Sequence, residues 1–343
     1  MIEPLTFSNP DTTWLERLPK VELHVHLEGA IPHDALWALV QKYGGDPAVP
    51  GLPELKNKFR YRDFPQFVAA WSWKNGFLRE YEDFTFIAEA VGRDFARQNI
   101  RYAEAFFSPT DFSHHGLRPQ KLAEAVRRGL ARIPETRVAL VADLVRDDGP
   151  KQAEITLSQV HEARGQGVVG VGIGGSEHRF PPEPFAGVYE AARRLGFHTS
   201  AHAGEAAGSA SVWGAARILR ADRIGHGTRA GEDETLLDYL AERRIPLEMC
   251  PLSNLRTGLI TALDRHPIRR FFDRGLLVTV NTDDPAMFGK SLAGEYLGLM
   301  ETLDFSRDEI RTLILQAVQV SWLPDAEKRT LSDSFRRDPV WLD

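Results

Sequence analysis

The segment VELHVHLEGA, residues 21–30, decides the fold and indicates where the chemistry lies. Its apolar residues alternate with Glu22, His24 and His26, and this period of two predicts a β-strand. Both imidazoles then project from one face, about 7 Å apart along the strand, close enough to bind one metal ion. Gly29 and Pro32 end the strand, so the histidines lie near its C-terminal end. Taken alone, the segment also fits two histidines on a solvated strand face.

The remaining chain repeats the order of strand and helix. Seven further strands are expected at residues 100–106, 137–143, 168–172, 198–202, 223–226, 245–249 and 277–281. Amphipathic helices are expected between them, for example at 119–132, 153–166, 184–195, 211–219, 233–243 and 266–274. Eight β units separated by helices favour a parallel sheet closed into an α/β (β/α)8 TIM barrel over an open doubly wound sheet. No linker composition divides the chain, so we expect one domain over residues 1–343.

Two stretches fall outside this repeat. Residues 31–98 contain no clear strand and are rich in aromatic residues at helical spacing, such as Phe64, Phe67 and Trp71. We expect helices inserted after the first strand, which form either an ordinary helical core or a cap over the mouth of the barrel with rings that contact an aromatic substrate. Residues 304–343 are expected to form a C-terminal helical appendage packed on the barrel.

Composition excludes several classes of protein. A hydrophobic fraction of 43% with 26% charged residues is ordinary for a soluble globular chain. A net charge of −6 and the absence of a Lys/Arg run argue against a nucleic-acid partner. Cys250 is the only cysteine, which excludes an intramolecular disulfide and a multi-cysteine metal site. No signal peptide and no apolar run of the ~20 residues that a membrane span needs are visible, so we expect a cytoplasmic protein, with a homo-oligomer left open.

Ionisable residues gather after the predicted strands. The fifth strand is followed by His202 and Glu205, the sixth ends at His226, and the eighth is followed by Asp283 and Asp284. The C-terminal ends of barrel strands meet at one mouth. With the two histidines of the first strand, four of the eleven histidines and three carboxylates are therefore expected in a single active site.

Three imidazoles and one carboxylate suit Zn²⁺ and leave a position for water. We therefore expect His24, His26, His202 and Asp283 to bind one zinc ion. A water molecule on such an ion has its pKa lowered to about 7 and becomes a usable nucleophile. His226 is expected to orient or deprotonate this water.

The other carboxylates are expected to face the substrate. Glu205 lies one residue beyond a glycine, and desolvation would raise its pKa and make it a candidate proton donor to a ring nitrogen. Asp284 directly follows a predicted ligand, where it could hold a substrate N–H or a protonated nitrogen. Because Pro285 comes next, Asp283 and Asp284 could also cap a helix. The expected catalytic residues are Glu205, His226 and Asp283.

Seven segments carry a resemblance to a known family: ELHVHLEG (22–29), FSP (107–109), GGSE (174–177), HAGE (202–205), RIGHG (223–227), CPLSN (250–254) and NTDDP (281–285). In this order they resemble the adenosine deaminase family of the amidohydrolase superfamily, from about residue 18 to residue 295. The resemblance implies a metal-dependent hydrolase that replaces the 6-amino group of a small-molecule purine by oxygen and releases ammonia. It also implies that Glu205 protonates N1, that Asp284 contacts N7 and that the backbone of Gly175 contacts N3.

The same resemblance leaves the substrate open. Vertebrate-type members carry Asp where this chain has Glu28, at a position that meets the sugar hydroxyls, and Glu occurs in bacterial relatives that act on free adenine or modified adenosines. The segments GIGGSE (172–177) and SNLRT (253–257) look closer to relatives that deaminate 6-amino-6-deoxyfutalosine. We expect adenosine, converted to inosine, ahead of the futalosine compound and free adenine. The expected substrate contacts are His26, Glu28, Ser108, Gly175 and Asp284.

Other classes are weaker fits. Barrel hydrolases with two metals commonly need a carboxylated lysine on the fourth strand, and residues 168–172 contain no lysine. A catalytically silent binding barrel would show the loss of a ligand or of Glu205, and none is lost. The cysteine-ligated nucleobase deaminases are excluded by the single cysteine. Glu177 is either a solvated loop acid or a functional residue, and surface or core positions are expected for His33, His114, His115, His161, His178, His198 and His266.

Overall fold

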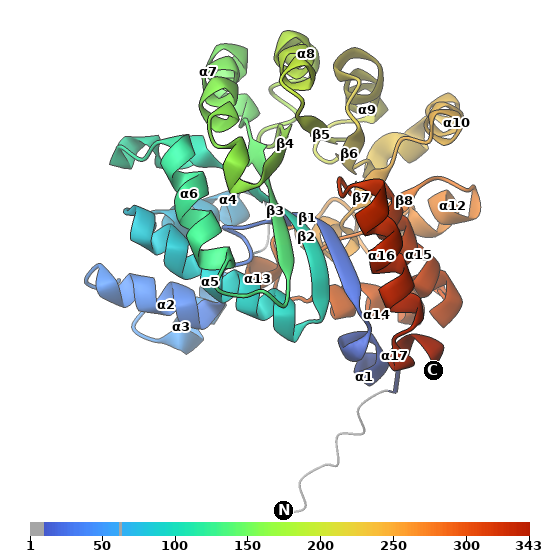
Figure 1. Cartoon of the computed structure of the whole chain (residues 1–343), viewed down its shortest axis with the longest axis horizontal. Helices are drawn as coiled ribbons and strands as arrows, with labels where there is room; N and C mark the ends of the chain where they lie inside the picture. The colour runs from blue at the N-terminus through green and yellow to red at the C-terminus, as the bar shows by residue number, and fades with distance from the viewer. Residues whose placement is uncertain (1–9, 62–63) are drawn as a thin grey trace, which may run out of the picture.

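The computed structural model describes residues 10–61 and 64–343, without the side chains of residues 64 and 65. Eight parallel strands stand side by side in sequence order, and helices surround them (Figure 1). The strands are β1 (Lys20–His26), β2 (Ile100–Phe107), β3 (Arg137–Asp143), β4 (Val168–Gly172), β5 (His198–Ala203), β6 (Arg223–His226), β7 (Leu247–Met249) and β8 (Val278–Val280). A parallel bridge between Val25 and Asp283 brings the end of β8 to β1. The sheet is thus nearly closed, which confirms the predicted TIM-type barrel.

Helices lie outside the strands, as expected for such a barrel (Figure 1). Those that alternate with the strands are α6 (Pro119–Leu130), α7 (Gly149–His161), α8 (Ala186–Arg194), α9 (Ser209–Trp213), α10 (Glu234–Arg243), α11 (Pro251–Arg256) and α12 (Ile268–Asp273). The predicted helix at 211–219 is α9 followed by a π-helix over Gly214–Leu219. None of the described helices is long and apolar enough to cross a membrane.

The two predicted additions to the barrel are both helical. Residues 31–98 form α2 (His33–Lys42), α3 (Leu52–Lys58), α4 (Phe64–Asn75) and α5 (Tyr81–Arg97). After β8 come α13 (Pro285–Phe288), α14 (Leu292–Leu303), α15 (Arg307–Val320), α16 (Asp325–Arg336) and α17 (Pro339–Leu342). The indole N–H of Trp14, in α1 (Pro10–Arg17), donates to the carbonyl oxygen of Val340 over 3.0 Å. The two ends of the described chain therefore lie together (Figure 1).

Strand β1 is buried on both faces. All seven of its residues are buried, because the polar face lines the inside of the barrel and the apolar face packs against the surrounding helices. The alternative of two histidines on a solvated strand face is therefore wrong. Strands β7 and β8 are shorter than predicted, with three residues each. Beyond β8 the side chain of Asn281 takes over the pairing, since its carbonyl oxygen accepts from Leu23 N over 3.0 Å and its amide donates to Met249 O over 3.3 Å.

The opposite end of the barrel is closed by charges and one aromatic ring. The buried guanidinium of Arg223 pairs with Glu104 on β2 and with Glu248 on β7. The ring of Trp322, between α15 and α16, lies 3.7 Å from the guanidinium, and its backbone N–H donates to Glu104 over 2.6 Å. Burial raises the pKa of Glu248, but Arg223, His24 and Ser200 together outweigh burial and the net direction is downward, so Glu248 is ionised. The C-terminal segment is thus packed on the barrel, as predicted.

Candidate active site

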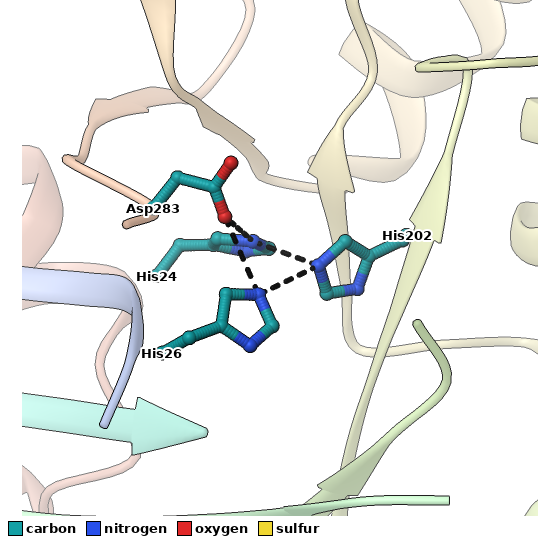
Figure 2. Close-up of side chains that lie close together, drawn as sticks. All are labelled: His24, His26, His202 and Asp283. Atoms are coloured by element: carbon teal, nitrogen blue, oxygen red, sulfur yellow. Dashed lines mark hydrogen bonds and ion pairs between the residues drawn. The ribbon is translucent and has the colours of Figure 1, made fainter. Parts of the chain in front are cut away.

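Four side chains converge at the C-terminal mouth of the barrel (Figure 2). The Nε2 atom of His202 lies 3.1 Å from that of His24 and 3.2 Å from that of His26. The Oδ1 atom of Asp283 lies 3.3 Å from His26 Nε2 and 3.7 Å from His24 Nε2. All four residues are buried. The structure therefore brings together the four residues predicted to bind a metal, from β1, from β5 and from the segment after β8.

The hydrogen bonds behind these imidazoles test whether a cation fits. The Nδ1 atom of His24 lies 2.9 Å from Oε2 of the ionised Glu248, and Nδ1 of His202 lies 3.1 Å from the carbonyl oxygen of Ile173. Both partners can only accept, so both rings carry a proton on Nδ1 and, when neutral, a lone pair on Nε2. Burial and the neighbouring imidazoles lower the pKa of His202 well below its usual range, which keeps this ring neutral. Two lone pairs that face each other over 3.1 Å repel unless a cation lies between them.

The donor set therefore fits a divalent metal ion. In each of these four residues one donor atom lies within 4.8 Å of the donor atoms of the others. Three imidazole nitrogens and one carboxylate oxygen match the ligands of a catalytic zinc site with a remaining position for water.

Backbone geometry places Asp283 at this point. Its φ of +61° lies in the left-handed region, which Asp adopts more readily than most residues. Its N–H donates to His24 O over 3.0 Å, and its carbonyl oxygen accepts from His26 N over 2.8 Å. The hydroxyl of Ser253 donates to Asp283 Oδ2 over 2.6 Å, which leaves Oδ1 for the histidines. The contacts that close the barrel thus also orient this carboxylate.

Glu248 was not predicted from the sequence as a residue of the site. A carboxylate that receives the second N–H of a metal-binding histidine fixes the ring and raises its basicity. One signal was available, because Glu248 is the one charged residue of strand β7. The pairing itself was not predictable, since 224 residues separate the two side chains.

A chain of hydrogen bonds determines the tautomer of His226. The His266 Nδ1 atom accepts from Ile268 N over 3.2 Å, so its Nε2–H donates to Asn254 Oδ1 at 3.2 Å. The hydroxyl of Thr228 donates to the same oxygen over 2.7 Å. The Asn254 amide nitrogen is left for His226 Nδ1, 3.2 Å away. Neutral His226 consequently carries its proton on Nε2 and presents a donor to the site. His266 is a satisfied core residue, as expected.

Glu205 is on the loop after β5, and its side chain lies beside that of His226. Its Oε2 is 3.6 Å from His226 Nε2, and burial raises its pKa while His226 opposes the shift. The backbone N–H groups of Gly204, Glu205 and Ala207 donate to the carboxylate of Glu177 over 2.6, 3.0 and 3.0 Å. Glu177 is 2% exposed, so it is not a solvated loop acid. It fixes the loop that carries Glu205.

A cavity of about 520 Å³ opens next to these groups. Helix α4 contributes Phe67, Trp71 and Asn75 to its wall. His114, for which a surface or core position was predicted, is exposed and also lines the cavity. Predicted site residues on the wall are His26, Ser108, Gly175, His202, Glu205, His226, Asp283 and Asp284.

Glu28 is placed differently from the other predicted substrate contacts. Glu28 is not one of the described residues that line the cavity. Its side chain is buried and turns toward Ser108, whose backbone N–H donates to Glu28 Oε1 over 3.0 Å. Glu28 thus supports the cavity wall from behind.

Asp284 presents an unsatisfied oxygen. Its Oδ1 atom is buried and has no hydrogen-bond partner within the described residues. Burial, with the neighbouring charge of Asp283, raises the pKa of Asp284 to about 8. A Cβ at Gly29 would lie 1.7 Å from this oxygen, so only glycine leaves room for the carboxyl group.

The comparisons with known proteins agree with this geometry. A family model described as adenosine deaminase matches residues 19–337. The chain belongs to the adenosine deaminase family. This confirms the resemblance drawn from the seven segments, and the chain is a hydrolytic deaminase with an amidohydrolase-type fold.

Three proteins similar to this chain illustrate the range of relatives. The aminodeoxyfutalosine deaminase of Streptomyces avermitilis is 35% identical over 337 residues, which cover 96% of this chain and 94% of the relative. The crystal structure of an adenine deaminase from Arthrobacter aurescens superposes with a TM-score of 0.87 at 30% identity, covering 93% of this chain and 98% of that one. The crystal structure of an amidohydrolase from Burkholderia ambifaria, solved with bound zinc, superposes with a TM-score of 0.87 at 28% identity, covering 97% of this chain and 94% of that one.

Substitution of Glu248 tests whether this carboxylate orients the imidazole of His24. Glu248→Gln keeps the volume but removes the charge that receives the N–H of His24, so the affinity for zinc should fall about 10- to 100-fold. Competition with a coloured chelator measures this affinity. Glu190→Gln, which removes only a surface pair with Arg194, is the control and should leave zinc affinity unchanged. Equal affinities in the two variants would contradict the role of Glu248.

Proposed function

We propose that the chain is a zinc-dependent deaminase that replaces the 6-amino group of an adenine-containing nucleoside by oxygen, with adenosine converted to inosine and ammonia released. The observation that carries the proposal is the convergence of His24, His26, His202 and Asp283, the last three of which line one cavity together with Glu205. Zn²⁺ held there would lower the pKa of a bound water to about 7 and polarise it toward attack.

Glu205 is the proton carrier in this proposal. Its carboxyl lies within reach of His226 and Asp283, and its raised pKa suits a group that both accepts and returns a proton. It takes one proton from the attacking water and passes it to N1, while the oxygen bonds to C6. The remaining hydroxyl proton goes to the amino group, which leaves as ammonia. The product carries oxygen at C6 and a proton on N1.

His226 orients the water in this proposal. Its Nε2–H can donate to the attacking oxygen and hold one lone pair toward C6. Of the two roles expected from the sequence, orientation therefore fits the tautomer and deprotonation does not. Asp283 would help to hold the metal, and its backbone pairs with His24 and His26 of β1.

Asp284 and Gly175 position the purine. A carboxyl group with a pKa of about 8 is largely protonated at pH 7, so Asp284 can donate to N7. Gly175 has φ +103°, and a Cβ there would lie 2.2 Å from Asp147 Oδ2, so a side chain is excluded at this position. The bare backbone can approach N3 closely.

Two other substrates stay as candidates. An aminodeoxyfutalosine deaminase at 35% identity over nearly the whole chain favours 6-amino-6-deoxyfutalosine as the second candidate. The adenine deaminase structure keeps free adenine as the third. A cavity of about 520 Å³ exceeds the space of a single purine base, and this favours a substrate that carries a substituent on N9.

Steady-state kinetics with the three compounds test the proposal. Adenosine should give the highest kcat/KM, with inosine and ammonia as products. Glu205→Gln should lower kcat by about 10²- to 10⁴-fold at unchanged zinc content, because the proton carrier is lost and every metal ligand remains. Release of no ammonia from any of the three compounds would contradict the proposed reaction, and a higher kcat/KM for either other compound would replace adenosine as the substrate.

Two substitutions separate the roles of His226. The amide nitrogen of Gln can stand near the position of Nε2 and donate, but it cannot accept a proton as a base. His226→Gln should therefore keep at least about tenfold more activity than His226→Ala, a difference of the size of one hydrogen bond to a charged group. Equal losses in the two variants, measured as kcat at saturating substrate, would assign proton transfer rather than orientation to His226.

A further inference from the structure

Lys74 is a buried cation that the proposed reaction does not use. It lies in the last turn of α4 and is 1% exposed. Its ammonium donates to Asn75 Oδ1 over 2.8 Å and lies 3.6 Å from the centroid of the Trp71 ring. No described carboxylate forms an ion pair with it. Lysine is almost never this buried without a charged partner, so the position needs an explanation.

Two neighbours of Lys74 form part of the cavity wall. Trp71 and Asn75 both line the cavity, and Trp71 meets His26 edge-on, with ring centroids 6.0 Å apart and an interplanar angle of 88°. The Trp71 indole N–H and the Asn75 amide each lie 3.3 Å from Asp111 Oδ2 and donate to it. The ammonium therefore holds the ring by its face, while Asp111 holds it by its N–H.

Three acids on other elements face the ammonium. They are Glu28 after β1, Asp284 after β8 and Asp111 after β2. Glu28 Oε2 is buried without a hydrogen-bond partner, and the charge of Lys74 opposes the upward shift that burial gives to the pKa of Glu28. Burial lowers the pKa of Lys74 to about 8 and the neighbouring acids, Glu28 foremost, oppose the shift, so the group stays mostly charged at pH 7.

We propose that Lys74 is a positioning residue that fixes the Trp71 ring as the cavity wall beside His26 and holds helix α4 against the end of β1, and thereby determines how tightly the purine is bound. The effect on purine binding rests on the proposed function, whereas the positioning of Trp71 and α4 by Lys74 does not. Lys74 contacts none of the reacting groups, so it acts on substrate binding and not on the chemical step. A cation over a desolvated tryptophan face is one of the stronger contacts of this kind.

Kinetics of charge-removing and charge-keeping variants test the proposal. Lys74→Met keeps an unbranched apolar side chain and removes the charge, and it should raise KM about tenfold with kcat within about twofold of wild type. Lys74→Arg keeps a cation over the ring and should hold KM within about threefold of wild type. The control is Lys58→Met. It removes a cation of α3 that lies 4.5 Å from the ring of Trp73, which is in α4 like Trp71 but does not line the cavity. This control should leave KM unchanged.

Hydrogen exchange supplies a readout that does not depend on the substrate. Backbone amides of α4 should exchange faster in Lys74→Met than in Lys58→Met. If the wild type deaminates none of the three compounds, the proposed function fails, and the exchange experiment still decides the inference. A Lys74→Met protein with wild-type KM and wild-type exchange overturns it, and so does a loss confined to kcat. If that variant does not fold, Lys74→Gln is expected to raise KM to the same extent, and an unchanged KM in it overturns the inference.

Discussion

The structure depends on two imidazole lone pairs that face each other over 3.1 Å inside the barrel. Glu248 fixes one ring from behind and the carbonyl oxygen of Ile173 fixes the other, so neither ring can turn a proton toward its neighbour. This arrangement is unfavourable for a protein without a cation and favourable for one that binds a cation. The fold keeps it in place because both rings are buried on strands of one sheet.

Glu248 connects this centre to the far end of the barrel. One of its oxygens receives the His24 N–H and the other meets the Arg223 guanidinium, which in turn pairs with Glu104 and stacks on Trp322. A buried carboxylate stays charged only when such partners surround it. Through Trp322, the C-terminal segment thereby helps to keep the charge that orients His24.

Much of this was predictable from the chain alone. Alternation in residues 21–28 placed His24 and His26 on one face, and the rule that strand ends meet at one mouth added His202, His226 and Asp283. What a local pattern cannot show is which side chain lies across the barrel. For that reason Glu248 and the Asn254–His266 pair behind His226 were missed, and the contact of Glu28 with the backbone of Ser108 was not predicted. Helical periodicity likewise predicted α4 but gave no sign of an ammonium buried against Trp71.

A crystal structure of the purified, active protein, with diffraction data collected on both sides of the zinc absorption edge, would decide whether these side chains bind zinc. We expect one anomalous peak per chain, from an ion that lies about 2.0–2.1 Å from the Nε2 atoms of His24, His26 and His202 and is also bound by Asp283. A catalytically active crystal with no metal peak between these side chains, or with the metal held by other residues, would contradict this expectation.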